Sequence, residues 1–304
     1  MSAEPNQTSV NAALFKAIAL MLMAALGFSF MNVLIRWTSS ELHAFQIAFF
    51  RNLFGLVFML PWLISNGYRS FKTQRLKLFF IRALLGISAM YCYFWGITVL
   101  PLAKAVALSF TVPLFVTIGA AVVLHEKVHI RRWIAVLVGF VGTLIILRPS
   151  IDGDMFASLV VVASSILMAA SVLIIKSLSR TEDANVIVMY MVLLMTPLSL
   201  PVAIYVWQWP SWEIWMGVIV MGFLGSFAHL MFTSSLKMSD VSIIMPFDFA
   251  RLPFIIVMAW VFFDQSVDQW TVIGAAIVFA SGIYIAHREA QLNKRRAMQP
   301  KVTS

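Results

Sequence analysis

The feature that most constrains this chain is a succession of long apolar runs, each ended by a short segment of charged or turn-forming residues. A helix that crosses about 30 Å of hydrocarbon needs about 20 predominantly apolar residues. By this criterion we predict an all-α integral membrane protein with ten transmembrane helices. The ten segments cover residues 14–36, 44–64, 77–98, 104–124, 132–148, 156–176, 186–207, 213–235, 242–263 and 270–287.

Composition excludes the other broad classes of protein. Of the 304 residues, 61% are hydrophobic and 12% are charged, whereas an average soluble domain has about 45–50% apolar and about 25% charged residues. A water-soluble globule of this size cannot bury so much apolar surface, and a disordered chain requires low hydrophobicity. Cys92 is the only cysteine in the sequence, which excludes an intrachain disulfide and a thiolate metal cluster.

Lysine and arginine residues indicate the orientation in the membrane. With a cytoplasmic amino terminus, 16 of the 22 lie on the cytoplasmic side and 3 on the opposite side. This bias follows the positive-inside rule, so we predict a multi-pass protein of the bacterial-type inner membrane with both termini cytoplasmic. Because these residues lie in short loops and the tail, the net charge of +9 does not indicate nucleic-acid binding. The first run, from Ala17 to Ile35, is longer than the ~7–15-residue core of a signal peptide and is interpreted as a retained helix.

The two halves of the chain resemble each other at a spacing of about 140 residues. The repeated pairs are Arg36 and Lys176, Pro61 and Pro201, Gly86 and Gly225, Pro113 and Pro253, and Gly142 and Gly282. Each half holds five predicted helices, an odd number, so the second half is inverted in the membrane relative to the first. Inverted repeats are typical of secondary transporters, whose substrate site lies near the midplane between the repeats. The predicted organisation is a cytoplasmic tail (1–13), a first repeat (14–148), an outer linker (149–155), a second repeat (156–287) and a basic cytoplasmic tail (288–304).

Four stretches carry a resemblance to a known family. They are Phe49–Gly55 (FFRNLFG), Leu100–Ala107 (LPLAKAVA), Val112–Phe115 leading to Leu124–Lys127, and Trp133–Pro149. On these stretches the chain resembles the EamA-type family of the drug/metabolite transporter superfamily, from about Phe15 to His287, with a more divergent second half. The resemblance implies ten helices in two inverted repeats around a central cavity lined by helices one to four and six to nine. It also implies peripheral fifth and tenth helices available for a homodimer, and transport of small metabolites by exchange or proton coupling.

Ionisable residues inside the predicted helices are the first candidates for the site. They are Arg51, His229, Asp248 and Arg251. A charge at the bilayer centre costs at least about 2.5–3.5 kcal/mol, so such residues usually face a cavity or a partner. We predict that the two arginines attract an anionic or zwitterionic group, that Asp248 couples transport to a proton or cation, and that His229 relays the proton. The alternatives are that Asp248 and Arg251 only neutralise each other and that His229 is a packing residue. Arg82 is predicted to extend to the cytoplasmic surface.

Prolines and aromatic residues add further candidates. Pro113 and Pro253, the latter together with Pro246, interrupt helices at matching positions of the two halves, where exposed backbone groups bind substrate in many transporters. Isolated prolines are also common in membrane helices. Tyr91 and Trp95 lie on one helix with Tyr93 and Phe94, and they are predicted to stack on a flat heterocycle. The alternative is that these aromatic residues face lipid.

One motif indicates a different function. The sequence from His125 to His129 matches H-E-x-x-H, the zinc-protease signature, so an intramembrane zinc metalloprotease is the alternative function. Asp152, a candidate third ligand, falls at the opposite membrane face, roughly 27 Å away by helix rise, whereas zinc ligands lie about 2.0–2.2 Å from the metal. The sequence also lacks the G-x-x-x-x-G-K-[ST] loop of ATP-hydrolysing transporters.

We therefore predict a secondary active transporter and not an enzyme, with no cofactor and no resident metal. It would move an anionic, zwitterionic or heteroaromatic metabolite across the inner membrane by alternating access. Its expected partners are the substrate, the lipid bilayer, a coupling proton or counter-substrate, and a second copy of the chain. The sequence leaves the identity of the substrate and the direction of transport open.

Overall fold

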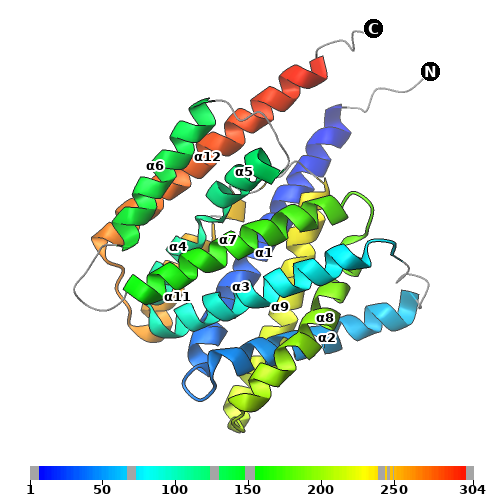
Figure 1. Cartoon of the computed structure of the whole chain (residues 1–304), viewed down its shortest axis with the longest axis vertical. Coiled ribbons are helices and arrows are strands. Elements are labelled where there is room, and N and C mark those ends of the chain that lie inside the picture. The colour runs from blue at the N-terminus through cyan, green and yellow to red at the C-terminus, as the bar shows by residue number, and fades with distance from the viewer. Residues whose placement is uncertain are drawn as a thin grey trace.

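In the computed structural model, every regular element of the described residues is a helix (Figure 1). The structure describes residues 7–66, 73–123, 130–147, 155–238, 244, 247–248 and 250–298. This confirms the predicted all-α class. The helices are α1 (Gln7–Thr38), α2 (Ala44–Asn66), α3 (Leu76–Val99), α4 (Leu102–Ser109), α5 (Val112–Val123), α6 (Ile130–Leu147), α7 (Met155–Leu178), α8 (Ala184–Tyr205), α9 (Trp212–Met238), α11 (Arg251–Phe263) and α12 (Gln269–Met298).

Helix length and hydropathy identify the segments able to cross a membrane. Among the described residues, six helices are long and apolar enough to do so, namely α1, α2, α3, α7, α8 and α9. Shorter apolar stretches lie at Leu102–Val116, Trp133–Ile146, Arg251–Phe263 and Gln269–Ser281. These four overlap the remaining predicted segments, and the full count of ten crossings stays a prediction. The start of α1 and the end of α12 lie at the same end of the molecule (Figure 1).

The structure corrects one predicted helix, the segment at 104–124. It is divided into α4 and α5 by a break at Phe110 and Thr111. The backbone N–H groups of these two residues donate to carbonyls only three residues back, at 3.2 Å in each case, and tighten the end of α4. Pro113 follows in the first turn of α5, where the missing N–H of proline costs no helical hydrogen bond. Pro253 occupies the same place in the first turn of α11.

The helices pack in a pattern that the two halves share. Helix α1 packs on α9, and the corresponding helix of the second half, α7, packs on α3. Likewise α5 packs on α7 while α11 packs on α1, and α2 packs on α9 while α8 packs on α3. The contacts of α2 with α8 and of α6 with α12 join equivalent elements of the two halves. Exchanging the halves thus leaves the set of main contacts unchanged, as expected for two related repeats.

Basic residues at the ends of α1 and α7 repeat this relationship in detail. The Arg36 guanidinium donates to the carbonyls of Ile97 and Thr98 at the end of α3, both at 2.7 Å. The Lys176 ammonium donates to the carbonyl of Leu236 near the end of α9, at 3.2 Å. Both cations satisfy carbonyl groups that lack a helical partner and oppose the negative end of the helix dipole. Arg36 and Lys176 are one of the repeated pairs in the sequence.

Helices α6 and α12 lie side by side at one edge of the molecule (Figure 1). Gly142 and Gly274 bring their backbones together, since an added Cβ on Gly142 would lie 2.8 Å from the Gly274 carbonyl oxygen. Small residues permit such close approach of membrane helices. The outward face of α6 carries exposed Leu137 and Leu144. The α6–α12 pair is therefore apolar and peripheral to the central bundle. The site is formed by the other helices.

Polar contacts join the two halves at both ends of the bundle. At one end the Glu41 carboxylate accepts from the Ser211 backbone N–H and hydroxyl, both at 2.8 Å. The Gln46 amide there donates to the Gln208 carbonyl at 2.6 Å. At the other end the Thr73 hydroxyl donates to the Glu182 carboxylate at 2.6 Å. The central cavity lies between these two sets of contacts.

Candidate functional site

A cavity of about 140 Å³ lies at the centre of the bundle. Its walls come from α1 to α5, from α7 to α9, from Asp248 and from the start of α11. Among the described residues, none that lines it belongs to α6 or α12. The cavity is thus enclosed by the two halves together, with apolar walls and a few polar side chains, as ligand sites usually are.

Arg51 is the largest fully buried side chain of the protein's described part. It lines the cavity from α2, and its Nη1 donates to the Asn52 side-chain oxygen at 3.0 Å. Its Nε and Nη2 groups have no hydrogen-bond partner among the described residues. Gly225 of α9 provides the space for this guanidinium, because an added Cβ there would lie 2.5 Å from Nε.

Arg82 contradicts its predicted position. It does not extend to the cytoplasmic surface but lines the cavity from α3 with 3% of its side chain exposed. Helix α8 covers it, and Nη2 lies 3.1 Å from the sulfur of Met191. Within the described residues its Nε and Nη1 have no hydrogen-bond partner. Arg82 lies close enough to Arg51 for their charges to interact.

Asp248 and Arg251 form an ion pair one helical turn apart. The second carboxylate oxygen of Asp248 and Nε of Arg251 have no further partner in the described part of the chain. The Arg251 guanidinium also lies over the ring of Phe28, 5.1 Å from the centroid, and 5.9 Å from that of Phe110. These are cation–π contacts. The positive charge of Arg251 is therefore compensated by protein groups.

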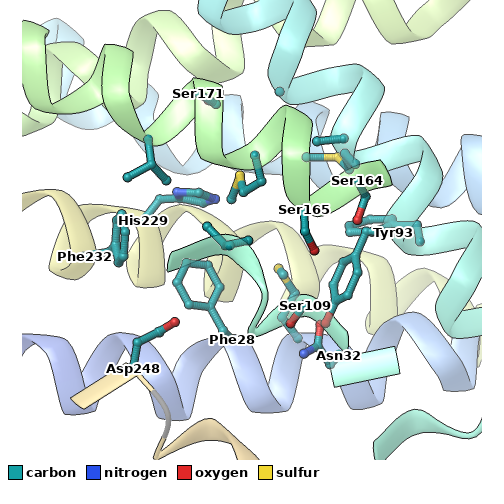
Figure 2. A pocket seen from close by; sticks show the side chains of 18 of the residues that line it. Phe28, Asn32, Tyr93, Ser109, Ser164, Ser165, Ser171, His229, Phe232 and Asp248 are labelled. Atoms are coloured by element: carbon teal, nitrogen blue, oxygen red, sulfur yellow. The ribbon is translucent and has the colours of Figure 1, made fainter. Parts of the chain in front are cut away.

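His229 lines the cavity from α9 and is 8% exposed. Its ring meets the edge of Phe28, with ring centroids 5.0 Å apart and an interplanar angle of 83°. Figure 2 shows Phe28 between His229 and Asp248. Arg51, Arg82 and Arg251 line the same cavity and lie close enough to His229 for their charges to act on it.

A second group of polar side chains gathers around the Tyr93 side chain. Asn32 of α1 and Ser109 of α4 lie beside its hydroxyl, and Ser164 and Ser165 of α7 lie toward the other end of the Tyr93 side chain (Figure 2). The Ser164 hydroxyl donates to the Val161 carbonyl at 2.6 Å and keeps its lone pairs free to accept. Sequence reasoning missed this cluster, because uncharged polar residues are common in membrane helices.

Helical spacing from Arg82 would have selected the tyrosine that lines the cavity. Arg82, Gly86, Met90 and Tyr93 follow one another at three- and four-residue steps and all line the cavity, so they share one face of α3. Tyr91 is off this face. Its ring packs on Phe45 at 4.7 Å between centroids and its hydroxyl donates to the Ser199 carbonyl at 3.4 Å.

Of the other predicted site residues, some line the cavity and some lie outside it. Arg51, Pro113, His229, Asp248 and Arg251 all line the cavity. Trp95 does not; it packs on Phe156 with ring centroids 5.9 Å apart. Pro253 is outside the cavity wall as well, in the first turn of α11. The remaining candidates, Pro246 and the H-E-x-x-H motif from His125 to His129, lie outside the described residues.

Comparison with known proteins supplies the family. A model of the EamA-like transporter family matches residues 15–148 and again residues 155–286. A riboflavin transporter of Vibrio cholerae is 32% identical over 90% of this chain and 94% of its own. A riboflavin transporter of Rhizobium johnstonii is 30% identical over 96% and 99%. An S-adenosylmethionine uptake transporter of Rickettsia prowazekii is 28% identical over 85% and 88%.

A solved crystal structure has the same fold. It covers 97% of this chain and 100% of its own, with a TM-score of 0.62 and 17% sequence identity. The curated relatives named above are transporters, which does not support the metalloprotease alternative.

Proposed function

The chain belongs to the EamA-like transporter family, and from this premise we propose that it is a secondary active transporter for a hydroxylated heteroaromatic metabolite of the riboflavin type. It is a multi-pass transporter of the inner membrane and not an enzyme. The observation that carries the proposed substrate class is the central cavity, which combines aromatic rings, hydroxyl groups and buried guanidinium groups.

The charge of the cavity favours one of the two substrates that the relatives' names print. Arg51, Arg82 and Arg251 against Asp248 give a net charge of +2 with neutral His229. S-adenosylmethionine carries a sulfonium cation, and its entry into a positive, poorly solvated cavity is opposed by charge repulsion. Riboflavin is uncharged at neutral pH and presents ring carbonyl groups that accept hydrogen bonds. The cavity therefore favours a flavin over S-adenosylmethionine.

Alternating access is the transport mechanism that this architecture supports. The cavity lies between two halves with equivalent packing. Polar contacts close each end of the bundle, through Glu41 and Ser211 on one side and Thr73 and Glu182 on the other. We propose that one set of contacts opens while the other stays closed, so that the halves rock around a fixed site.

The Asp248–Arg251 ion pair is the proposed coupling element. A substrate group or a proton that binds Asp248 would break the ion pair and release the Arg251 guanidinium. This guanidinium also lies over the ring of Phe28. His229 lies across Phe28 from the carboxylate (Figure 2) and would receive or supply the proton. The alternative is exchange against a second metabolite, in which the ion pair stays intact and a pH gradient has no effect.

Uptake by reconstituted protein tests the proposal. Labelled riboflavin is added to the outside of proteoliposomes, with and without a pH gradient. The wild-type protein is compared with the variant Arg51→Gln. We expect saturable uptake that unlabelled riboflavin abolishes, that excess S-adenosylmethionine leaves unchanged, and that falls about 10-fold or more in the variant, because hydrogen bonds to a charged group contribute about 1.5–3 kcal/mol.

Two results would overturn the proposal. Competition by S-adenosylmethionine as strong as by riboflavin would contradict the argument from cavity charge. Uptake of neither compound by folded, correctly reconstituted protein would reject the flavin class. An effect of the pH gradient that Asp248→Asn removes would support the coupling role of the ion pair.

A further inference from the structure

We propose that the cavity holds its ligand in a single orientation between two chemically different ends. Arg51 and Arg82 form the arginine end, which binds the carbonyl-bearing edge of the ring. Asn32, Tyr93, Ser109, Ser164 and Ser165 form the hydroxyl end, which binds the polyhydroxylated chain. This inference rests on the proposed function and names the substrate groups that each end recognises.

The arginine end offers donors that the protein leaves unused. Each guanidinium is buried and keeps two nitrogen atoms without a hydrogen-bond partner in the described part of the chain. Guanidinium groups have donors and no acceptor, in a planar arrangement that suits a planar group with several acceptor atoms. The dione edge of a flavin ring presents carbonyl oxygens and ring nitrogens in one plane. No described carboxylate is paired with either arginine, so these donors are free for a ligand.

The hydroxyl end offers donors and acceptors together. The hydroxyls of Ser109, Ser164 and Ser165 donate to backbone carbonyls of their own helices, at 2.7, 2.6 and 3.2 Å. Their lone pairs remain to accept hydrogen bonds. Tyr93 and Asn32 add groups that donate as well as accept. A chain of hydroxyl groups requires this mixture, because each hydroxyl both donates and accepts.

The spacing of Arg82 and Tyr93 along α3 suits an elongated ligand. Arg82 and Tyr93 lie on one face of α3, eleven residues apart, which corresponds to about 16 Å along the helix axis. Between them lie Gly86 and the apolar side chain of Met90, with Met195 facing from α8. A flat ring with a polar edge and a flexible chain spans such a site. A compact ion would occupy only one end.

A matched pair of flavins separates the two ends. Riboflavin and lumiflavin share the ring system, but lumiflavin has a methyl group in place of the hydroxylated chain. Binding of each is measured by quenching of flavin fluorescence on the purified protein in lipid nanodiscs. Tyr93→Phe removes a single hydroxyl and is compared with Tyr91→Phe, which removes one on the same helix outside the cavity.

We expect Tyr93→Phe to weaken riboflavin binding about 5-fold, the effect of one neutral hydrogen bond, and to leave lumiflavin binding unchanged. Ser165→Ala should act in the same direction. Arg82→Gln should weaken both flavins equally, by about 10-fold or more, since it removes donors to the shared ring. Tyr91→Phe and Lys16→Gln, which removes an exposed charge, should change neither affinity.

Each contrary result has a distinct meaning. Equal weakening of both flavins by Tyr93→Phe would overturn the assignment of the hydroxyl end to the chain. An Arg82→Gln effect on riboflavin alone would overturn the orientation and place the chain at the arginine end. If the folded wild-type protein binds neither flavin, the proposed function fails and the orientation fails with it, whereas binding without these selective losses rejects the orientation alone.

Discussion

The cavity is lined by two kinds of arginine, and the difference between them separates structure from binding. Arg251 has an ion-pair partner in Asp248 and the rings of Phe28 and Phe110 around it. Arg51 and Arg82 have one polar side-chain contact each, to Asn52 and to Met191, and no carboxylate in the described part of the chain. The first charge is compensated within the protein, and the other two are not.

Uncompensated charge in an apolar bundle is unfavourable unless water or a ligand solvates it. The protein therefore loses stability by keeping Arg51 and Arg82, and the site gains donors that a substrate can use. The ion pair of Arg251 contributes differently, because it restrains Asp248 on the other side of Phe28 from His229. This contrast predicts that the same substitution lowers stability at Arg251 but not at Arg82.

The largest expected effect comes from Arg82→Met. We expect substrate uptake to fall about 100-fold, because a guanidinium that makes two hydrogen bonds to the substrate is lost, while the melting temperature rises or stays constant. Arg251→Met should instead lower the melting temperature, because it leaves a buried carboxylate unpaired. Uptake assays and thermal unfolding monitored by size-exclusion chromatography measure both quantities. A lower melting temperature in Arg82→Met would contradict the contrast.

The next prediction concerns the ion pair itself. Arg251→Met and Asp248→Leu should each destabilise the protein, and the double variant should recover most of the loss. The expected coupling between neighbouring residues of this kind is about 0.5–3 kcal/mol. Thermal unfolding of the four proteins gives the coupling directly. Additive losses would mean that Asp248 and Arg251 act separately and that the charge of Arg251 has another partner.

The variant Gly225→Ala tests whether transport depends on the position of the Arg51 guanidinium, and it changes no charge. Gly225→Ala adds a methyl group 2.5 Å from Nε of Arg51, so the guanidinium must move. We expect transport to fall about 10-fold, with a loss of stability of about 1–3 kcal/mol from overpacking. Gly86→Ala is the matched control in the same cavity, because its added Cβ meets Met195 at an ordinary distance of 3.4 Å. Equal losses in the two variants would remove the special role of Arg51.

Much of the fold could be predicted from the sequence because a bilayer imposes simple rules. Apolar length determines the helices, and Pro113 indicated an interruption of the segment 104–124, which the structure has between α4 and α5. The position of the break, at Phe110 and Thr111 ahead of the proline, was not predicted, because both residues suit a continuous apolar helix. The sequence also indicated the deep charges of Arg51, His229, Asp248 and Arg251, which the structure brings to one cavity.

The errors of the sequence-based predictions concern the rotation of a helix about its own axis, which decides the direction that each side chain faces. Arg82 is six residues into α3, within reach of the membrane surface by length alone, and only its rotation toward α8 buries it against Met191. The same rotation takes Tyr93 into the cavity and Tyr91 toward Phe45. Rotation depends on packing against neighbouring helices, and apolar helices of a membrane protein carry little periodicity that would reveal it.

The smallest expected effect concerns the aromatic contact on the compensated side. Phe28 packs against both Arg251 and His229, with its ring centroid 5.1 Å from the guanidinium carbon. Phe28→Leu keeps an apolar side chain but removes the cation–π contact, which contributes about 0.5–2 kcal/mol. We expect uptake to fall about 3-fold and the melting temperature to fall slightly, because Asp248 still holds Arg251. Phe232→Leu is the control, since Phe232 also lines the cavity but contacts Phe28 rather than the guanidinium. A loss in Phe28→Leu as large as in Arg82→Met would show that the ring binds substrate directly, and the division between structural and binding charges would then have to include Phe28 on the binding side.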